Sequence, residues 1–255
     1  MNASEAQLLR ERMIPTGERQ YGVTHDAIKA NHTQRYRWAA SQLEGHERVL
    51  DAGCGTGYGS ALLAEASEHT TGIDVSEESV ELAKHYWGEE RPNLDFEHHE
   101  LHSLENLEAG FTAAVCFEVI EHLVMPELFL VDLWVKTRPD SRCFFSVPNI
   151  NVEPHRLDSN PFHLRHYTPS NFLDLLELCG FGGVDLYDQT GPVNNPHPIA
   201  PHKPPTGGKI ILASATRNPS AGVLFQDRGA MRKSFPLASH HAFIDRCRTI
   251  RSLKK

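Results

Sequence analysis

Three features that would assign this sequence to a class at once are missing. It has no run of about 18 apolar residues, so no transmembrane helix is predicted. Residues 1–12 are polar and mixed in charge, which is unlike a secretory signal peptide. The 5 cysteines are odd in number and include no Cys-x-x-Cys spacing, which argues against a disulfide framework or a zinc knuckle. We therefore expect a reduced, cytoplasmic protein whose 255 residues form one large domain.

A surplus of positive charge is missing as well. The formal net charge is −8 at pH 7, whereas proteins that wrap nucleic acid usually present a basic face. Residues 218–255 differ from the rest, with 8 Lys and Arg against 2 Asp and Glu. We interpret this stretch as a solvated basic tail, in which Phe243, Cys247 and Ile250 have the spacing of a short amphipathic helix. Nucleic acid is therefore not the expected partner.

Apolar segments of two kinds alternate along the chain. The short ones predict strands near 47–52, 69–74, 94–98, 112–117, 142–147, 182–188 and 208–216. The longer ones have apolar residues at helical spacing and predict helices near 29–44, 57–66, 76–87, 126–137 and 169–180. This alternation predicts an α/β fold, with a doubly wound, mostly parallel seven-stranded sheet and helices on both of its faces.

A proline-rich loop separates the last two predicted strands. Residues 191–208 contain 6 prolines, so a crossover helix does not fit there. Two successive strands joined only by a loop pair in antiparallel fashion, so we expect an antiparallel strand at the C-terminal edge of the sheet. The chain then divides into a lead-in over 1–28, one domain over 29–217 and the basic tail over 218–255.

An acid and three glycines follow the first predicted strand. Asp51 ends that strand, and the glycines occupy alternate positions over 53–57, before the next helix begins. Glycines let the backbone turn sharply and approach a ligand where a Cβ would collide. A second acid, Asp74, ends the next strand, where a carboxylate can accept hydrogen bonds from both ribose hydroxyls of a nucleoside. The pattern therefore predicts a nucleoside-binding loop.

The motif Val-Leu-Asp-x-Gly-Cys-Gly-x-Gly, which begins at Val49, resembles the first motif of the class I S-adenosylmethionine-dependent methyltransferases. The resemblance extends over residues 30–216 and implies a Rossmann-like methyltransferase domain with S-adenosyl-L-methionine as its cofactor. The cofactor-binding residues that it implies are Tyr36, Asp51, Gly53, Cys54, Gly55, Asp74, Val75, Glu100, Leu101, Phe117 and Glu118.

Two details of this site have open alternatives. In similar enzymes the segment before the first strand folds over the cofactor, so Arg35 or Tyr36 is expected to reach the methionine carboxylate. A solvent-facing helix position is the alternative for Arg35. Glu100 stands where the family motif usually ends in Asp, so it either recognises the adenine amino group or is a loop carboxylate in water.

A group that activates the acceptor is predicted after the fourth strand. An aliphatic hydroxyl is a poor nucleophile at neutral pH, so its methylation needs a general base or a divalent metal ion. If the segment is helical, Glu118, Glu121 and His122 lie on one face, and His163, ahead of His166, adds a fourth ligand. The set is similar to that of metal-dependent 2′-O-methyltransferases of small-RNA 3′ ends and of ubiquinone-pathway O-methyltransferases.

Three roles are open for this group. As metal ligands, its members suit Mg²⁺, Mn²⁺, Fe²⁺ or Zn²⁺. As acid–base catalysts, the candidates are Glu121, His122 and His163. In the third role the glutamates and the histidine only support the cofactor pocket and pack the start of a helix, as in many class I methyltransferases without an assigned metal.

The resemblance implies an enzyme that methylates a hydroxyl of a small molecule or a saccharide. The segment Thr16-Gly17-Glu18-Arg19 is similar to the lead-in of bacterial methyltransferases of glycan or secondary-metabolite pathways. One alternative is a metal-dependent RNA ribose 2′-O-methyltransferase. Another is a non-catalytic cofactor-binding subunit, because a fold can keep binding and lose its chemistry. Whether two copies form a homodimer is left open.

Overall fold

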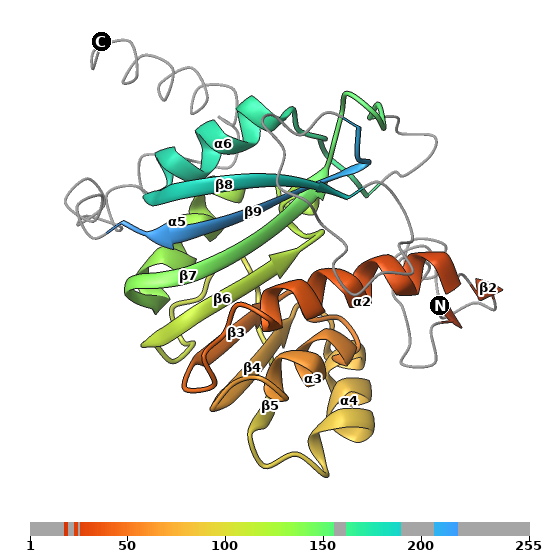
Figure 1. Ribbon diagram of the computed structural model, residues 1–255. Helices are drawn as coiled ribbons and strands as arrows, with labels where there is room; N and C mark the ends of the chain where they lie inside the picture. Colours follow the sequence, from red (N-terminus) through yellow and green to blue (C-terminus); the bar gives the residue numbers. More distant parts are fainter. Residues whose placement is uncertain (1–17, 20–22, 25, 156–161, 190–206, 219–255) are drawn as a thin grey trace.

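The computed structural model describes residues 18–19, 23–24, 26–155, 162–189 and 207–218. These residues form a seven-stranded sheet with helices on both faces, and a separate short hairpin (Figure 1). The strands of the main sheet are β3 (Arg48–Ala52), β4 (His69–Asp74), β5 (Leu94–His98), β6 (Phe111–Phe117), β7 (Thr137–Pro148), β8 (Phe181–Gln189) and β9 (Ile210–Arg217). The hairpin consists of β1 (Glu18–Arg19) and β2 (Val23–Thr24).

The helices have the order that the sequence predicts. They are α2 (Asp26–Ala40), α3 (Tyr58–Ala64), α4 (Glu77–Ala83), the π-helical turn Lys84–Gly88, the 3-10 turn Ile120–His122, α5 (Pro126–Lys136) and α6 (Pro169–Leu178). Local chemistry sets several of the starts. Ser76 caps α4 by accepting a hydrogen bond from the N–H of Ser79, and Thr168 caps α6 through the N–H of Asn171.

The strand order determines where a ligand-binding crevice is expected in the sheet. The order is β5-β4-β3-β6-β7-β9-β8, so the chain leaves β3 toward β4 and later returns to the other side of β3 as β6. In open α/β sheets ligands bind at the carboxyl ends of the strands where the order reverses. The predicted glycine loop follows β3 and the predicted acceptor group follows β6, so both lie at this crevice.

The antiparallel end of the sheet is confirmed, with one refinement. Strands β5, β4, β3, β6 and β7 are parallel, whereas β9 is antiparallel to both β7 and β8. The last two strands therefore form an antiparallel pair at one edge, as predicted. The reversed strand β9 itself lies between β7 and β8, so β8 is the outermost strand.

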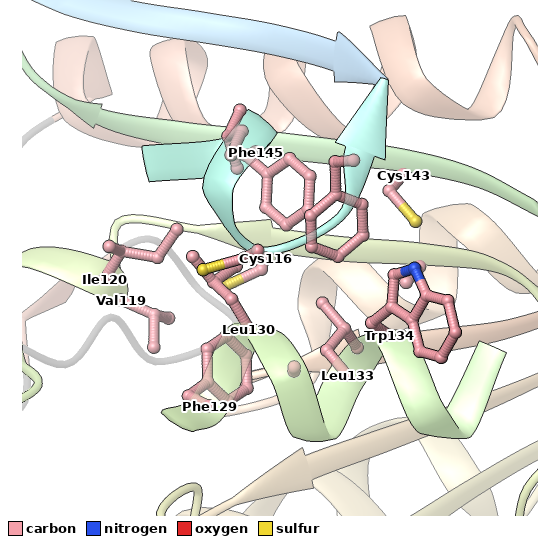
Figure 2. Close-up of a cluster of buried hydrophobic side chains, with 14 of the residues drawn as sticks. Cys116, Val119, Ile120, Phe129, Leu130, Leu133, Trp134, Cys143 and Phe145 are labelled. Carbon is pink, nitrogen blue, oxygen red and sulfur yellow. The ribbon is translucent and has the colours of Figure 1, made fainter. Parts of the chain in front are cut away.

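Two hydrophobic layers hold the sheet. Figure 2 shows Phe129, Leu130 and Leu133 of α5 packed against Cys116 of β6 and Phe145 of β7. Full burial of each large apolar side chain contributes about 1.5–3 kcal/mol. On the opposite face α2 and α3 pack against β3, β6 and β7 through a second cluster of buried side chains. The two layers fix the ends of β3 and β6, from which the site loops start.

Two global expectations can be compared with the described residues. No helix among them is both long enough and apolar enough to cross a membrane. Their cysteines, at positions 54, 116, 143 and 179, are all buried and none forms a disulfide with another. The basic tail and the amphipathic helix expected in it lie outside the described residues.

Candidate active site

The loop between β3 and α3 carries the glycines of the predicted cofactor site. Its backbone is left-handed at Gly53 and Gly55, where φ is +82° and +56°. A Cβ on Gly53 would collide with the side chain of Val119, so packing within the protein requires this glycine. A Cβ on Gly55 would meet no atom of the described residues within 4 Å, so this glycine faces open space. The loop is thus packed at its start and open in its middle, as a ligand cradle requires.

Asp74, at the carboxyl end of β4, holds this loop in place. Its Oδ2 accepts a hydrogen bond from the backbone N–H of Gly55 at 2.9 Å, and its Oδ1 accepts one from Ser76 at 2.9 Å. Each carboxylate oxygen has two acceptor positions, so Asp74 can still accept further bonds. The neighbouring Val75 leaves 47% of its surface exposed beside this carboxylate.

The carboxyl group of Asp51 is engaged within the protein. Its Oδ1 accepts a hydrogen bond from the hydroxyl of Tyr36 at 3.1 Å, and its Oδ2 accepts one from Ser60 at 2.6 Å. Burial raises the pKa of Asp51 to about 7, against the opposing effect of these two hydrogen bonds. Asp51 therefore ties α2 and α3 to the end of β3. Sequence reasoning misses Ser60, whose signal is a small hydroxyl side chain in the first turn after the glycine loop.

Arg35 is a buried cation beside the same loop. It is 1% exposed, and its Nη1 lies 3.5 Å from Oε1 of Glu118. Its Nε and Nη1 atoms have no hydrogen-bond partner within the part of the chain that the structure describes. Of the two side chains expected to reach a ligand carboxylate, Tyr36 donates to Asp51, whereas Arg35 retains unused donors. The solvent-facing position considered for Arg35 is wrong.

Residues 118–122 do not form the α-helix on which the one-face arrangement of Glu118, Glu121 and His122 depended, and this corrects that arrangement. Glu118 has a left-handed backbone with φ of +56°, and only Ile120–His122 form a 3-10 turn. The N–H of Glu118 donates to the carbonyl and hydroxyl oxygens of Ser146, and that hydroxyl donates to Oε1 of Glu118 at 2.8 Å. Glu118 is therefore directed to Ser146 and Arg35, away from the face on which helical spacing would put it.

The other predicted acceptor-side residues come together. Glu121, His122 and His163 each offer one potential ligand atom, and these atoms lie within 4.8 Å of one another. The 3-10 turn positions the first two, and the N–H of Leu164 donates to the carbonyl of Glu121 at 2.9 Å, which brings the later loop alongside. The rings of His122 and His163 meet edge to face with centroids 4.7 Å apart. We call these three residues the Glu-His-His group.

The histidines of this group are held neutral. Burial lowers the pKa of His122, although a hydrogen bond to the carbonyl of Phe162 and the charge of Glu118 oppose this shift. Burial, together with the neighbouring imidazoles of His122, His166 and His155, lowers the pKa of His163 to about 3. A neutral imidazole can accept a proton or bind a metal ion, and two imidazoles with a carboxylate suit a borderline divalent cation.

The remaining predicted cofactor residues differ in their surroundings. Cys54 and Phe117 are buried, and the ring of Phe117 meets that of Tyr36 at a centroid distance of 5.1 Å. Leu101 is buried in the larger hydrophobic cluster. Glu100 is exposed in the loop after β5, and both of its alternative roles remain predictions.

The side chain of Asn149, which directly follows β7, is used by the fold. Its amide group donates to the carbonyl of Gly208 at 2.9 Å, and its Oδ1 accepts from the N–H of Asn151 at 3.1 Å. Its side chain is fully buried. Asn149 therefore connects the end of β7 to the start of β9.

Comparisons with known proteins identify the family of this domain. A family model described as a methyltransferase domain matches residues 49–133. A protein of Mycolicibacterium smegmatis, described as a probable S-adenosylmethionine-dependent methyltransferase, is 32% identical over 188 residues, which cover 73% of this chain and 70% of that protein. A ubiquinone biosynthesis O-methyltransferase of Aromatoleum aromaticum is 34% identical over 110 residues, or 43% of this chain and 47% of the relative. The chain thus spans about half the length of that relative.

A solved structure has the same fold. An N-methyltransferase of Bradyrhizobium japonicum in complex with S-adenosyl-L-homocysteine superimposes with a TM-score of 0.55 at 17% identity. The match covers 75% of this chain and 87% of that one, and at this identity it shows the fold alone. Three observations lead to one assignment: the glycine loop at the reversal of strand order, the matched domain and the Mycolicibacterium relative. The chain belongs to the S-adenosylmethionine-dependent methyltransferases.

Proposed function

We propose that this methyltransferase transfers the methyl group to a hydroxyl oxygen of a small molecule or a saccharide. The observation that carries the proposal is the Glu-His-His group, Glu121, His122 and His163. It lies at the crevice, because Val119, two residues before Glu121, packs against Gly53 of the cofactor loop. A hydroxyl acceptor must lose a proton, and this group offers bases or metal ligands that would assist that loss.

The residues around the glycine loop fit the cofactor. The open space at Gly55 would receive the methionine portion, and the unused donors of buried Arg35 would bind its carboxylate. Asp74 would accept bonds from the ribose hydroxyls, with Val75, Glu100 and Leu101 near the adenine. When bound, the cofactor supplies a methyl group already activated on a sulfonium. The protein's task is then to align the acceptor oxygen and remove its proton.

Two ways of activating the hydroxyl are compatible with the site. In the first, the lone pair of a neutral histidine, His163 ahead of His122, accepts the hydroxyl proton, and the carboxylate of Glu121 stabilises the resulting cation. In the second, Glu121, His122 and His163 would hold a divalent cation, whose chemistry would be Lewis-acid activation of the acceptor hydroxyl. Two imidazoles favour Fe²⁺, Zn²⁺ or Mn²⁺ over Mg²⁺. Glu118, which Ser146 and Arg35 engage, would have to turn to become a fourth ligand.

Several broader expectations accompany this proposal. The relative of Aromatoleum aromaticum is named an O-methyltransferase, which supports oxygen as the acceptor atom. The net charge of −8 favours a small acceptor over RNA. A domain over 29–217, a cytoplasmic location and assembly into a homodimer remain predictions.

The test combines metal removal with substitution. Turnover of the cofactor is measured with a panel of phenols, sugars and amines, before and after treatment with EDTA. We expect methylation of a hydroxyl compound and a loss of about 10²–10⁴-fold in kcat for His163→Ala. Loss of activity in EDTA that Mn²⁺ or Zn²⁺ restores would select the metal route. His85→Ala, on the surface after α4, serves as the control and should retain full activity.

The proposal fails if only amines are methylated. It also fails if His163→Ala, Glu121→Gln and EDTA treatment all leave the rate unchanged, because alignment alone would then account for the reaction.

A further inference from the structure

We infer that His166 is a positioning residue that fixes the tautomer of His163, so that Nε2 of His163 faces the acceptor site with a lone pair. The inference rests on the proposed function for its catalytic meaning, but its structural content is independent of it. His166 lies outside the Glu-His-His group and would act only through His163. A tautomer matters here because an N–H can neither accept a proton nor bind a metal ion.

The chain of hydrogen bonds begins at a backbone carbonyl. Nδ1 of His166 lies 2.6 Å from the carbonyl oxygen of Glu153. A carbonyl oxygen can only accept, so Nδ1 of His166 must carry the hydrogen. In a neutral imidazole one nitrogen is a donor and the other an acceptor, so Nε2 of His166 then carries the lone pair.

The second hydrogen bond transmits this choice to His163. Nδ1 of His163 lies 2.7 Å from Nε2 of His166, a distance at which one of the two nitrogens must donate. Because Nε2 of neutral His166 is an acceptor, Nδ1 of His163 is the donor. His163 is thereby fixed as the Nδ1–H tautomer, with the lone pair on Nε2.

The other histidine of the group reaches the same state by a shorter route. Nδ1 of His122 lies 3.0 Å from the carbonyl oxygen of Phe162, so it donates, and Nε2 carries the lone pair. Both rings therefore present the same kind of nitrogen beside Glu121. The difference is that a carbonyl sets the tautomer of His122 directly, whereas the side chain of His166 sets that of His163. A single side-chain substitution can consequently reverse the tautomer of His163 but not that of His122.

The loop that carries these residues is held by contacts that do not involve the tautomer. Nε2 of His155 lies 2.6 Å from the carbonyl oxygen of His163, and its ring meets that of His166 at a centroid distance of 5.3 Å. His155 thus contacts both members of the pair without entering the N–H···N bond between them. It provides a matched control for substitutions of His166.

The test uses three substitutions at one position. His166→Asp offers only acceptors and should keep His163 as the Nδ1–H tautomer. His166→Lys offers only donors and should move the hydrogen of His163 to Nε2. His166→Phe retains a ring without nitrogens and should leave both tautomers populated. Long-range ¹H–¹⁵N correlation spectra of the full chain, labelled with ¹⁵N-histidine and free of cofactor and acceptor, report the tautomer. His163→Gln identifies the signal.

We expect the Nδ1–H signature for His163 in the unaltered protein, in His166→Asp and in the control His155→Phe. In methyl transfer, His166→Asp should retain most of kcat. His166→Lys should lose about 10²–10⁴-fold, as removal of a base does, with the KM for the cofactor unchanged. An Nε2–H signal for His163 in the unaltered protein, or an unchanged tautomer in His166→Lys, would overturn the inference. Correct tautomers in a protein that methylates no hydroxyl would instead refute only the proposed function.

Discussion

Arg35 is a buried cation that the protein's own groups satisfy only in part. The carboxylate of Glu118 forms an ion pair with its Nη1 at 3.5 Å, but Nε and Nη1 have no hydrogen-bond partner among the described residues. An unsatisfied buried donor costs about 1–3 kcal/mol. Binding of a ligand carboxylate would remove this cost and add a charge-assisted bond. We therefore predict that recognition of the amino-acid end of the cofactor depends on the guanidinium of Arg35.

Arg35→Met should weaken binding of S-adenosylhomocysteine by about 10–100-fold, since a hydrogen bond to a charged group contributes about 1.5–3 kcal/mol. The affinity for 5′-methylthioadenosine, which has no amino-acid end, should stay the same. Calorimetry with both ligands measures the difference. Arg37→Met, on the exposed side of α2, is the control and should change neither affinity. An equal loss for both ligands would mean that Arg35 only supports the fold.

Asp51 makes stability depend on pH, because burial raises its pKa to about 7 in the folded protein. The unfolded chain has the ordinary carboxyl value of about 3.9, so between these two values the folded state binds more protons. Stability from this group is complete below pH of about 4 and is lost as pH rises to about 7. Asp51→Asn removes the titration. Urea unfolding at pH 5 and pH 8 should show the unaltered protein losing stability relative to the variant as pH rises. A difference that does not change with pH would contradict this.

Two glycines of one loop are expected to serve different purposes, Gly53 for packing within the protein and Gly55 for binding of the cofactor. Gly53 is closed off by Val119, whereas Gly55 faces open space among the described residues. Gly55→Val should therefore abolish detectable binding of S-adenosylhomocysteine, while the left-handed backbone costs only about 1–2 kcal/mol of stability. Gly53→Val should instead destabilise the fold through its collision with Val119. Thermal unfolding and calorimetry on the two variants measure both effects. Unchanged affinity in folded Gly55→Val would remove the loop from the cofactor site.

Elements that repeat a simple pattern could be predicted from the sequence, and those set by distant contacts could not. The strands and helices follow from apolar periodicity, and the glycine loop follows from its spacing. The one-face arrangement considered for Glu118, Glu121 and His122 does not form, because Ser146, on the neighbouring strand, holds Glu118 in a left-handed backbone. The insertion of β9 between β7 and β8 depends on pairing that no local pattern records.

The candidate site divides in the same way. Glu121, His122 and His163 could be singled out by residue type, because carboxylates and imidazoles are few beside an apolar strand end. Their approach, and the engagement of His163 by His166, depend on a loop that returns from some 40 residues away along the sequence. The sequence therefore indicates which residue types form the candidate site, but not how they are arranged in space.

The whole molecule is acidic, so the salt dependence of acceptor binding should distinguish a small-molecule acceptor from RNA. A protein that contacts 6–10 phosphates loses about 10³–10⁵-fold in affinity between 50 and 200 mM salt. With a net charge of −8, we expect the KM for the acceptor to change only a few-fold over this range. Steady-state kinetics at both salt concentrations give the answer. A steep rise in KM would favour RNA, with residues 218–255 as its anchor.

The position of β9 has a consequence for how the protein is made. The ribosome releases β7 and β8 before β9, yet β7 and β8 do not pair with each other in the finished sheet, because β9 lies between them. Until residues 210–217 emerge, one edge of β7 and the whole of β8 are without their partner, and unpaired edges are templates for pairing between chains. The nascent chain therefore still exposes unpaired strand edges late in translation, when only the last strand remains to be added.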